Sequence, residues 1–212
     1  NNINIIFGTH AIFQKNVKFK KLGLIIIDEQ HKFGVNQRKR LSDKGGNDCD
    51  VLLMTATPIP RTLTMTIYGD MDLSIIKEKP KNRKMIKTYS KLESKIDEVI
   101  KFIKKEINFG NQIFWVCPLI EESKKLDHTS AIKKFEYLKK LFPGQVSILH
   151  GKTDINEKEE VLKKFLNKKF KILVSTTIIE VGIDFPNANV IIIENANKFG
   201  LSQLHQLRGR VG

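Results

Sequence analysis

The sequence predicts an α/β protein with two parallel-sheet domains, each with helices on both faces of its sheet. Short runs rich in Ile, Val and Leu alternate with amphipathic segments, as in repeated βαβ units. The charged, proline-containing segment 77–84 has no apolar residue and is expected to be a linker. We therefore expect one domain over residues 1–80, incomplete at its N-terminus, and a second over residues 81–212.

Eight apolar runs have the length and composition of strands. They are residues 3–7, 22–28, 51–55, 85–90, 112–117, 146–150, 171–175 and 190–194. The run at 22–28 is expected to be a fully buried parallel strand, because Leu24 to Ile27 are all apolar. Three segments have the spacing of amphipathic helices: 96–107, 132–142 and 161–166. Asp154 or Asn156 is expected to cap the third helix.

Lys and Arg outnumber Asp and Glu by 37 to 23, which gives a formal net charge of +14 at pH 7. This excess favours a polyanionic partner, most simply nucleic acid, although lysines on solvated surfaces explain it equally well. No apolar run approaches the roughly 18 residues that cross a bilayer, and the N-terminus lacks the zones of a signal peptide. We expect a cytoplasmic protein with no membrane partner.

The two cysteines, Cys49 and Cys117, are far apart in the sequence and belong to no CxxC pattern. Both lie in or beside apolar strand-like runs, which suits buried, reduced thiols better than metal ligands. We assign them no function.

An acidic pair, Asp28 and Glu29, follows directly on a strand-like run, and Gln30 and His31 come next. Ligands of open parallel sheets bind beyond the carboxyl ends of the strands, where two carboxylates can hold Mg²⁺ through water and activate a nucleophile. This placement suggests nucleotide hydrolysis. A solvated turn, or a helix N-terminus stabilised by the helix dipole, is the alternative interpretation of the same residues.

Hydroxyl residues lie at the ends of two further strands. Thr55 and Thr57 can hydrogen-bond to the acidic loop beside them, or can belong to a turn that caps the next helix. Thr176 and Thr177 follow the run 171–175, where hydroxyls and backbone N–H groups suit the phosphate oxygens of a nucleotide or of DNA. Ordinary turn chemistry is the alternative for both.

Two later segments carry groups that suit a nucleotide. Gly182 allows close approach of the backbone, and Asp184 can accept a hydrogen bond from a ribose hydroxyl. Near the end of the chain, Arg208 and Arg210 flank a glycine. Arginine can stabilise charge on a transferring γ-phosphoryl group, although surface arginines without this role are commoner.

In order and spacing, these segments resemble motifs Ib, II, III, V and VI of superfamily 2 helicases. The matching segments are residues 8–10, 28–31, 55–58, 177–184 and 206–212. More narrowly, residues 8–11, 33–35, 58–62, 116–123 and 199–212 resemble the RecG family of bacterial branched-DNA translocases. The resemblance covers essentially the whole chain and implies two RecA-like domains.

The resemblance implies ATP and Mg²⁺ as cofactors. It implies that Asp28 holds Mg²⁺ through water and that Glu29 orients and deprotonates the water that attacks the γ-phosphate. It also implies that Gln30 and His31 sense that phosphate.

The same resemblance gives roles to residues after the acidic pair. Thr55 and Thr57 would couple the phosphate signal to the second domain, and Gln206 and Arg210 would complete the catalytic set from that domain. The remaining nucleotide-binding residues would be Gly182, Asp184, Arg208 and Gly209.

DNA is the partner that the resemblance implies, in the form of stalled forks, Holliday junctions and duplex arms. The residues expected to contact it are Gly8, Thr9, His10, Thr176 and Thr177. A monomer is expected, with single-strand-binding protein as a further partner in the intact system.

Two features depart from the helicase pattern. No GxxxxGK[ST] loop occurs, and the chain ends one residue before the final arginine of motif VI. We therefore expect a core fragment that is inactive alone. The alternatives are a transcription-repair coupling translocase, against which Gln30 and residues 117–123 argue, and a nucleic-acid-binding remnant that no longer hydrolyses ATP.

Overall fold

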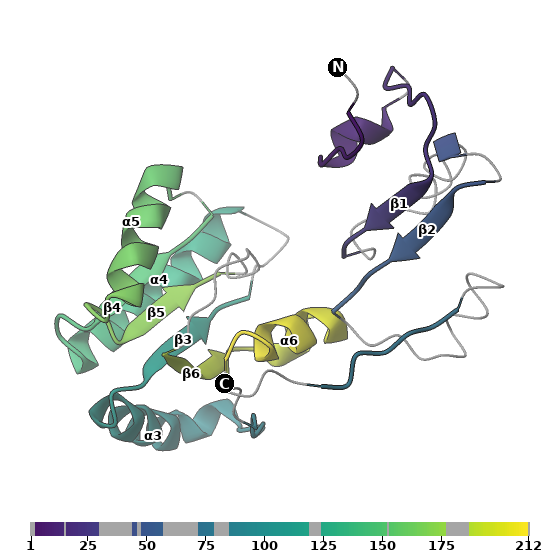
Figure 1. Ribbon diagram of the computed structural model, residues 1–212. Coiled ribbons are helices and arrows are strands. Elements are labelled where there is room, and N and C mark those ends of the chain that lie inside the picture. Colours follow the sequence, from purple (N-terminus) through teal and green to yellow (C-terminus); the bar gives the residue numbers. More distant parts are fainter. Residues whose placement is uncertain are drawn as a thin grey trace. The chain divides into compact units, whose positions relative to one another are not determined.

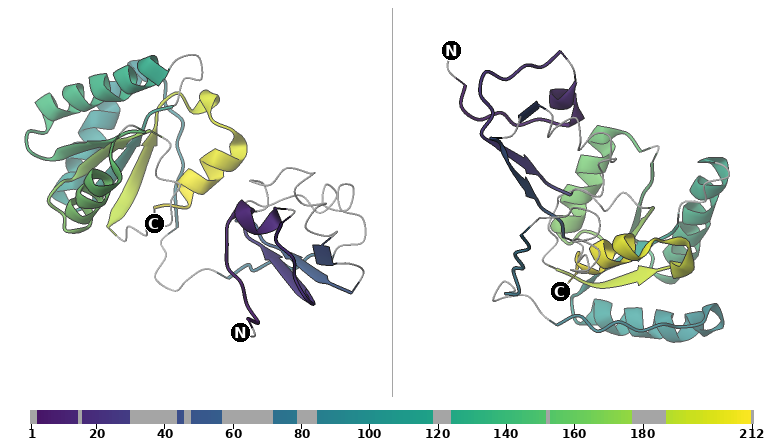
Figure 2. Two further views of the ribbon diagram at one scale, coloured as in Figure 1. Left: turned by 90° about the horizontal axis from the view of Figure 1, so that it is seen from above. Right: turned by 90° about the vertical axis from the view of Figure 1, so that its right-hand side faces the viewer.

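The computed structural model of the chain describes residues 3–14, 16–29, 44–45, 48–56, 72–78, 85–118, 124–151, 153–176 and 187–211. The chain forms two compact units, Asn1–Leu73 and Ser74–Gly212. Each unit has its own sheet (Figures 1 and 2). The predicted boundary between residues 80 and 81 lies outside the described residues.

The first unit contains two described strands, which confirm the predicted runs at 22–28 and 51–55. Strands β1 (Leu24–Ile27) and β2 (Asp50–Leu53) pair in parallel, with Ile27 level with Leu53. A short 3₁₀ helix, η1 (His10–Phe13), precedes them. The parallel pairing places the carboxyl ends of both strands at one edge of the sheet.

The prediction that β1 is fully buried is wrong. Ile25 and Ile27 are buried, whereas Leu24 and Ile26 are 54% and 56% exposed. Side chains alternate between the two faces of a strand, and in the described unit only one face of β1 packs against other apolar groups. That face contacts Leu22, Cys49 and Leu53.

Two other predicted strands are wrong. Residues 3–7 and 85–90 are described without strand structure, and no described strand pairs with either segment. A run of apolar residues forms a strand only when a partner satisfies its backbone N–H and C=O groups. Most side chains of both segments are exposed, and Phe7 is 93% exposed.

The second unit is built on a four-stranded, entirely parallel sheet in the order β4-β5-β3-β6. Its strands are β3 (Gln112–Val116), β4 (Val146–Leu149), β5 (Ile172–Ser175) and β6 (Ala188–Ile193). All four lie where the sequence predicts them. β3 and β5 are central, and every residue of these two strands is buried.

The three predicted helices are confirmed, and a fourth follows the sheet. The helices of the second unit are α3 (Ile96–Asn108), α4 (Lys124–Leu141), α5 (Ile155–Leu166) and α6 (Leu201–Arg208), with the short 3₁₀ segments η3 (Glu93–Lys95) and η5 (Ala196–Lys198). Asp154 occupies the N-cap position of α5, but its side chain makes no capping hydrogen bond. Asn156 lies inside the helix. Among the described helices, none is long and apolar enough to cross a membrane.

Helices cover both faces of this sheet, as predicted (Figures 1 and 2). On one face, α3 and α4 pack against Trp115 and its neighbours through Ile103 and Leu138. On the other face, Phe165 of α5 and Leu207 of α6 pack against the opposite side of the strands. The alternation of side chains along each strand therefore divides the core into two layers.

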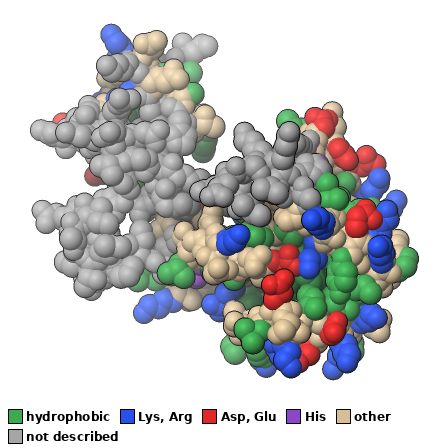
Figure 3. Space-filling view, turned by 180° about the vertical axis from the view of Figure 1, so that it is seen from behind, with side chains coloured by type: hydrophobic (Ala, Val, Ile, Leu, Met, Phe, Trp, Pro, Cys, Tyr) green, Lys and Arg blue, Asp and Glu red, His purple; other side chains and the backbone are tan. Residues whose placement is uncertain are grey.

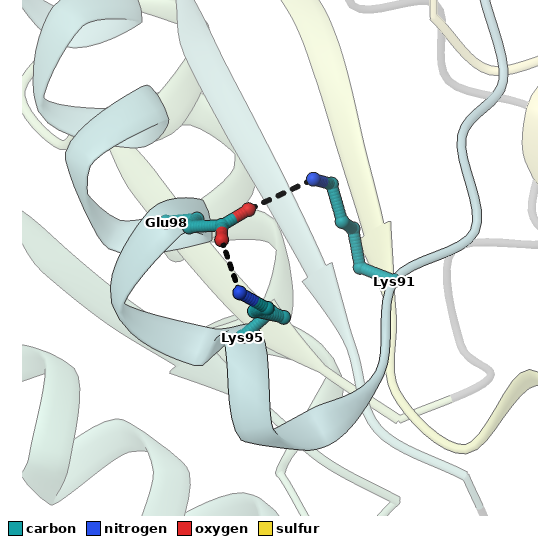
Figure 4. Close-up of polar contacts among 3 residues, drawn as sticks. All are labelled: Lys91, Lys95 and Glu98. Carbon is teal, nitrogen blue, oxygen red and sulfur yellow. Dashed lines mark hydrogen bonds and ion pairs between the residues drawn. The ribbon is translucent and has the colours of Figure 1, made fainter.

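The start of α3 is oriented by two ion pairs (Figure 4). Glu98 contacts the Nζ atoms of Lys91 and Lys95 at 2.8 and 3.0 Å. The hydrogen bond from Lys91 is the main reason why the pKa of Glu98 lies below its usual value, and Lys95 adds to the effect. Because all three side chains are about half exposed, the pairs orient the helix start and add little to stability.

The packing of Phe165 predicts a large stability effect. Its fully buried ring lies 5.2 Å from the ring of Phe114, so Phe165→Ala should leave a cavity and lower the free energy of unfolding by about 3–5 kcal/mol. Urea unfolding followed by the fluorescence of Trp115, the only tryptophan of the chain, measures this. Phe109→Ala is the control, because Phe109 is 69% exposed, and it should change stability little. Equal effects of the two substitutions would contradict the assigned core.

Candidate functional site

The acidic pair lies at the carboxyl edge of the first sheet. The β1–β2 ladder continues one residue past the strands, because the N–H of Met54 donates to the carbonyl of Ile27 at 2.8 Å. Glu29 and Thr55 each lie two residues beyond the paired strand ends, and both are half-buried. The register therefore brings the acidic loop and the Thr55 segment to the same edge, as the sequence predicts.

Glu29 has a strained backbone. Its φ of 50° is in the left-handed region, which is unfavourable for a residue with a Cβ atom. The N–H of Glu29 donates to Oδ1 of Asp28 at 2.8 Å, so the turn orients the Asp28 carboxylate. Strain of this kind persists where the surrounding structure holds it, often at functional sites.

Asp28 is exposed at the end of the strand, whereas Oε2 of Glu29 is buried. Within the described ranges, no three His, Cys, Asp or Glu side chains gather into a site that could hold a metal ion. Mg²⁺ is commonly held by one or two carboxylates together with water and substrate phosphates. A single exposed carboxylate such as that of Asp28 fits this mode of binding.

In the second unit, a row of polar side chains crosses the carboxyl edge of the sheet. The strand register aligns Leu149, Ser175, Val116 and Ile193, so the next residue of each strand belongs to the row. In sheet order, the row is His150, Thr176, Cys117 and Glu194. Backbone hydrogen bonds hold it: Cys117 N donates to Ser175 O at 2.8 Å, and Glu194 N donates to Val116 O at 2.9 Å.

Two hydroxyl groups of this edge are buried and make no hydrogen bond in the described structure. They are Oγ of Ser175 and Oγ1 of Thr176, in residues that are 0% and 2% exposed. A buried hydroxyl without a partner costs about 1–3 kcal/mol. Both groups are therefore donors without an acceptor at the carboxyl edge of the sheet.

Glu194 joins this edge to α4. Its Oε1 atom lies 2.5 Å from Nζ of Lys134, and that ammonium lies 5.1 Å from the centre of the buried Trp115 ring. Sγ of Cys117 donates to Oε2 of Glu194 at 3.6 Å. Burial is the main cause that raises the pKa of Cys117 to about 12, and the Glu194 charge adds to it. Cys117 is thus a buried, neutral thiol, as predicted, whereas Cys49 is only half-buried.

Sequence reasoning missed His150, Cys117, Glu194 and Lys134 as members of this edge. The first three are each the last residue of a predicted strand and lie directly after the observed strand, and their place at a strand end is the signal that could have found them. Lys134 is contributed by α4, and its place becomes apparent only from the packing. Thr153 supports His150, since its hydroxyl lies 3.1 Å from Nδ1 of the imidazole.

The predicted arginines lie at the end of α6, where Arg208 is the last helical residue and Arg210 follows the C-cap Gly209. Leu207 and Val211 are buried against the sheet, Arg210 is half-buried and Arg208 is exposed. Gly209 ends the helix, and a Cβ atom there would lie 3.2 Å from the carbonyl oxygen of Gln206. Gly209 therefore ends the helix, and Arg210 is the more buried of the two arginines.

The other predicted site residues are distributed as follows. Thr9 occupies the N-cap position of η1, which begins at His10, and Gly8 precedes them. A Cβ atom on Gly8 would lie only 2.5 Å from the side chain of Ile12, so any larger residue there would require Ile12 to move. Outside the described residues lie Gln30, His31, Thr57, Thr177, Gly182 and Asp184.

Two family models match the chain. The model of the helicase conserved C-terminal domain matches residues 94–212, more than half of the chain. The DEAD/DEAH box helicase model matches residues 1–66. The first match includes the whole sheet of the second unit, and the second includes β1, β2 and the acidic pair.

Curated relatives carry the same two regions. The chain is 52% identical to ATP-dependent DNA helicase RecG of Bacillus subtilis over 99% of its length, and 54% identical to that of Aquifex aeolicus over 100%. It spans 31% and 27% of those relatives.

Solved structures agree with this similarity. A structure of RecG bound to a three-way DNA junction matches the whole chain with 46% identity and a TM-score of 0.66, and the match covers 27% of that protein. Saccharomyces cerevisiae Dbp5 bound to RNA and ADP BeF3 matches 96% of the chain with 18% identity and a TM-score of 0.60, over 54% of its own length. The second match supports the fold alone.

The environment of Cys117 predicts low reactivity. With its pKa raised to about 12, the Cys117 thiol is almost entirely protonated at pH 8, and the thiolate is the reactive form. We expect iodoacetamide to modify Cys49 in the native protein while Cys117 stays unmodified, as mass spectrometry of peptides would show. Glu194→Gln should raise the reactivity only slightly, because burial is the larger cause. In urea, both thiols should react; native Cys117 reacting as fast as Cys49 would contradict its environment.

Proposed function

The chain belongs to the RecG family of helicases, and from this premise we propose that it forms part of an ATP-dependent DNA helicase. The protein acts as a double-strand translocase that remodels stalled replication forks and Holliday junctions by branch migration, in recombination and repair. It works as a monomer on duplex arms. The relative solved with a three-way DNA junction supports a branched substrate.

In this proposal the acidic pair performs the hydrolysis. Asp28 would hold Mg²⁺ through water, and the chemistry that the ion would supply there is neutralisation of phosphate charge. The carboxylate of Glu29 orients the attacking water and accepts its proton, which is the role of a general base. Gln30 and His31 sense the γ-phosphate. The observation that carries the proposal is the placement of Asp28 and Glu29 directly after β1, in a chain about half identical to RecG helicases.

Residues of the second unit complete the nucleotide site. We assign Gln206 and Arg210 to the catalytic set, because the fixed donors of arginine can stabilise charge on the γ-phosphoryl group. The half-buried position of Arg210 supports this choice over the exposed Arg208, which we assign to nucleotide binding. Gly182, Asp184 and Gly209 are the other proposed nucleotide-binding residues.

The same proposal assigns DNA contacts and coupling. Thr176 and Thr177 contact the DNA backbone, and the position of Thr176 at the carboxyl edge, directly after β5, supports this role. The remaining proposed DNA contacts are Gly8, Thr9 and His10. Phosphate contacts carry no sequence information, which suits a motor that moves along any duplex.

Coupling is assigned to Thr55 and Thr57. They pass the state of the γ-phosphate to the second unit, and the placement of Thr55 at the edge that carries Glu29 supports this. A γ-phosphate that holds a segment until hydrolysis is an established way of turning chemistry into motion.

Glu29 is the residue that tests the enzymatic part of the proposal. In a RecG-family protein that carries this segment together with a P-loop, Glu29→Gln should lower kcat for DNA-stimulated ATP hydrolysis by about 10²–10⁴-fold, because the general base is lost. KM for ATP should change little. Glu93→Gln, at an exposed glutamate of η3, is the matched control and should keep full activity.

The isolated chain provides the second arm of this test. Residues 1–212 contain no GxxxxGK[ST] loop, so we infer that they hydrolyse no ATP by themselves. A phosphate-release assay with and without duplex DNA measures this. Hydrolysis by residues 1–212 that Glu29→Gln abolishes would disprove the inference of inactivity, and full activity of the longer Glu29→Gln variant would disprove the role of Glu29.

A further inference from the structure

Two helices of the second unit, α4 and α5, end at the edge of the sheet opposite the row of polar side chains. In a βαβ unit the helix runs antiparallel to the strands, so its last turn lies near the amino end of the next strand. α4 leads into β4 and α5 leads into β5, and these two strands are neighbours in the sheet (Figure 1). The carbonyl of Gln145, just before β4, accepts hydrogen bonds from the N–H groups of Lys171 and Ile172 at 2.8 and 3.0 Å.

Five lysines surround these two strand starts, and we call them the lysine collar. They are Lys139, Lys140, Lys168, Lys169 and Lys171. The first four are exposed and Lys171 is half-buried. Residues 139–147 and 163–172 contain no Asp or Glu, and within the described structure none of the five lysines belongs to an ion pair. The collar is therefore a local excess of positive charge.

Charge alone does not single out this edge. Elsewhere in the described chain, Lys18, Lys20 and Lys21 are also exposed, and residues 1–27 contain no Asp or Glu. On the face in Figure 3, lysine and arginine side chains lie among acidic ones. Lysines in the last turn of a helix also complement its dipole, which accounts for Lys139 and Lys140 at the end of α4. A solvated surface would explain these two without any ligand.

The helix dipole does not explain the backbone conformation of Lys168. Its φ is 59°, and it occupies the left-handed position just after α5. The N–H groups of Lys168 and Lys169 donate to Phe165 O and Lys164 O at 2.8 and 3.0 Å, which is the hydrogen-bond pattern of a Schellman motif. Glycine is the usual residue at this position because it has no Cβ atom.

The end of α3 has the same Schellman motif without backbone strain. There Gly110, with φ of 84°, occupies the equivalent position. The N–H groups of Gly110 and Asn111 donate to Ile107 O and Glu106 O at 2.9 and 3.1 Å. α5 thus retains a lysine where α3 has a glycine, at a cost in backbone energy. Such strain, retained in an exposed basic residue, indicates that the ammonium group has a use.

We propose that the lysine collar binds the phosphate backbone of duplex DNA. The inference rests on the proposed function, which makes DNA the polyanion that the protein meets. The collar has five lysines, none of which belongs to an ion pair in the described structure, against a single nearby acidic residue, Glu136 of α4. This excess of positive charge suits the phosphates of a duplex, and such contacts depend on salt but not on sequence. Because the collar is at the amino edge of the sheet, away from the nucleotide groups, its contact with DNA needs no ATP.

Lys168→Gly separates this proposal from a purely structural role. The substitution relieves the left-handed strain, so the urea midpoint, followed by Trp115 fluorescence, should rise. Loss of one phosphate contact should at the same time weaken binding of residues 1–212 to a blunt 20-base-pair duplex about 3–10-fold at 50 mM salt. The slope of log K against log salt should fall by about one unit. Fluorescence anisotropy without nucleotide measures both.

Two further variants keep the test decisive. Lys169→Gln leaves the backbone geometry unchanged and should also weaken duplex binding. Lys101→Ala, at an exposed lysine in the middle of α3, removes the same charge away from the collar and should bind like the wild type. Equal losses in all three variants would overturn the proposal, and so would unchanged binding by Lys168→Gly or no duplex binding by the wild-type chain. These outcomes leave the Glu29→Gln test unaffected, since no ATP is present.

Discussion

Parallel strand pairing is the constraint on which the candidate site residues of both sheets depend. Because all described strands of a sheet run in one direction, the residue after each strand falls at the same edge, however far apart these residues are in the sequence. In the first unit this rule brings Glu29 and Thr55 to one edge. In the second it aligns Cys117, Thr176 and Glu194, although Cys117 and Glu194 are separated by 77 positions.

The same constraint makes the two edges of the second sheet chemically different. The carboxyl edge combines buried hydroxyls with an ion pair between Glu194 and Lys134, and each of these two side chains is more than three quarters buried. The amino edge has exposed lysines around the ends of α4 and α5. The first environment suits a ligand that satisfies fixed, desolvated groups, and the second suits a salt-dependent polyanion.

The sequence predicted the elements whose partners lie within the described chain. The strands β3 to β6 are predicted from their apolar composition, and they form because each has a parallel neighbour in the sheet. The helices α3 and α5 are predicted because their apolar residues recur at helical spacing. Residues 3–7 and 85–90 have the same composition but no described partner, and composition cannot reveal a missing partner. Asp28 and Glu29 were found from their place after a strand. Glu194 and Lys134 were missed, because only strand register and helix packing bring them together.

Backbone strain adds information that neither motif nor charge contains. Three described residues other than glycine have positive φ: Glu29, Lys168 and Asn195. Asn195 is explained by its chemistry, since a short amide side chain tolerates the left-handed region. Glutamate and lysine have no such tolerance, so their strain must be held by the surrounding fold. One of them is the proposed general base and the other belongs to the lysine collar. Strain thus occurs at the proposed general base of the first unit and in the lysine collar of the second unit, and it distinguishes Lys168 from the many other lysines of the chain.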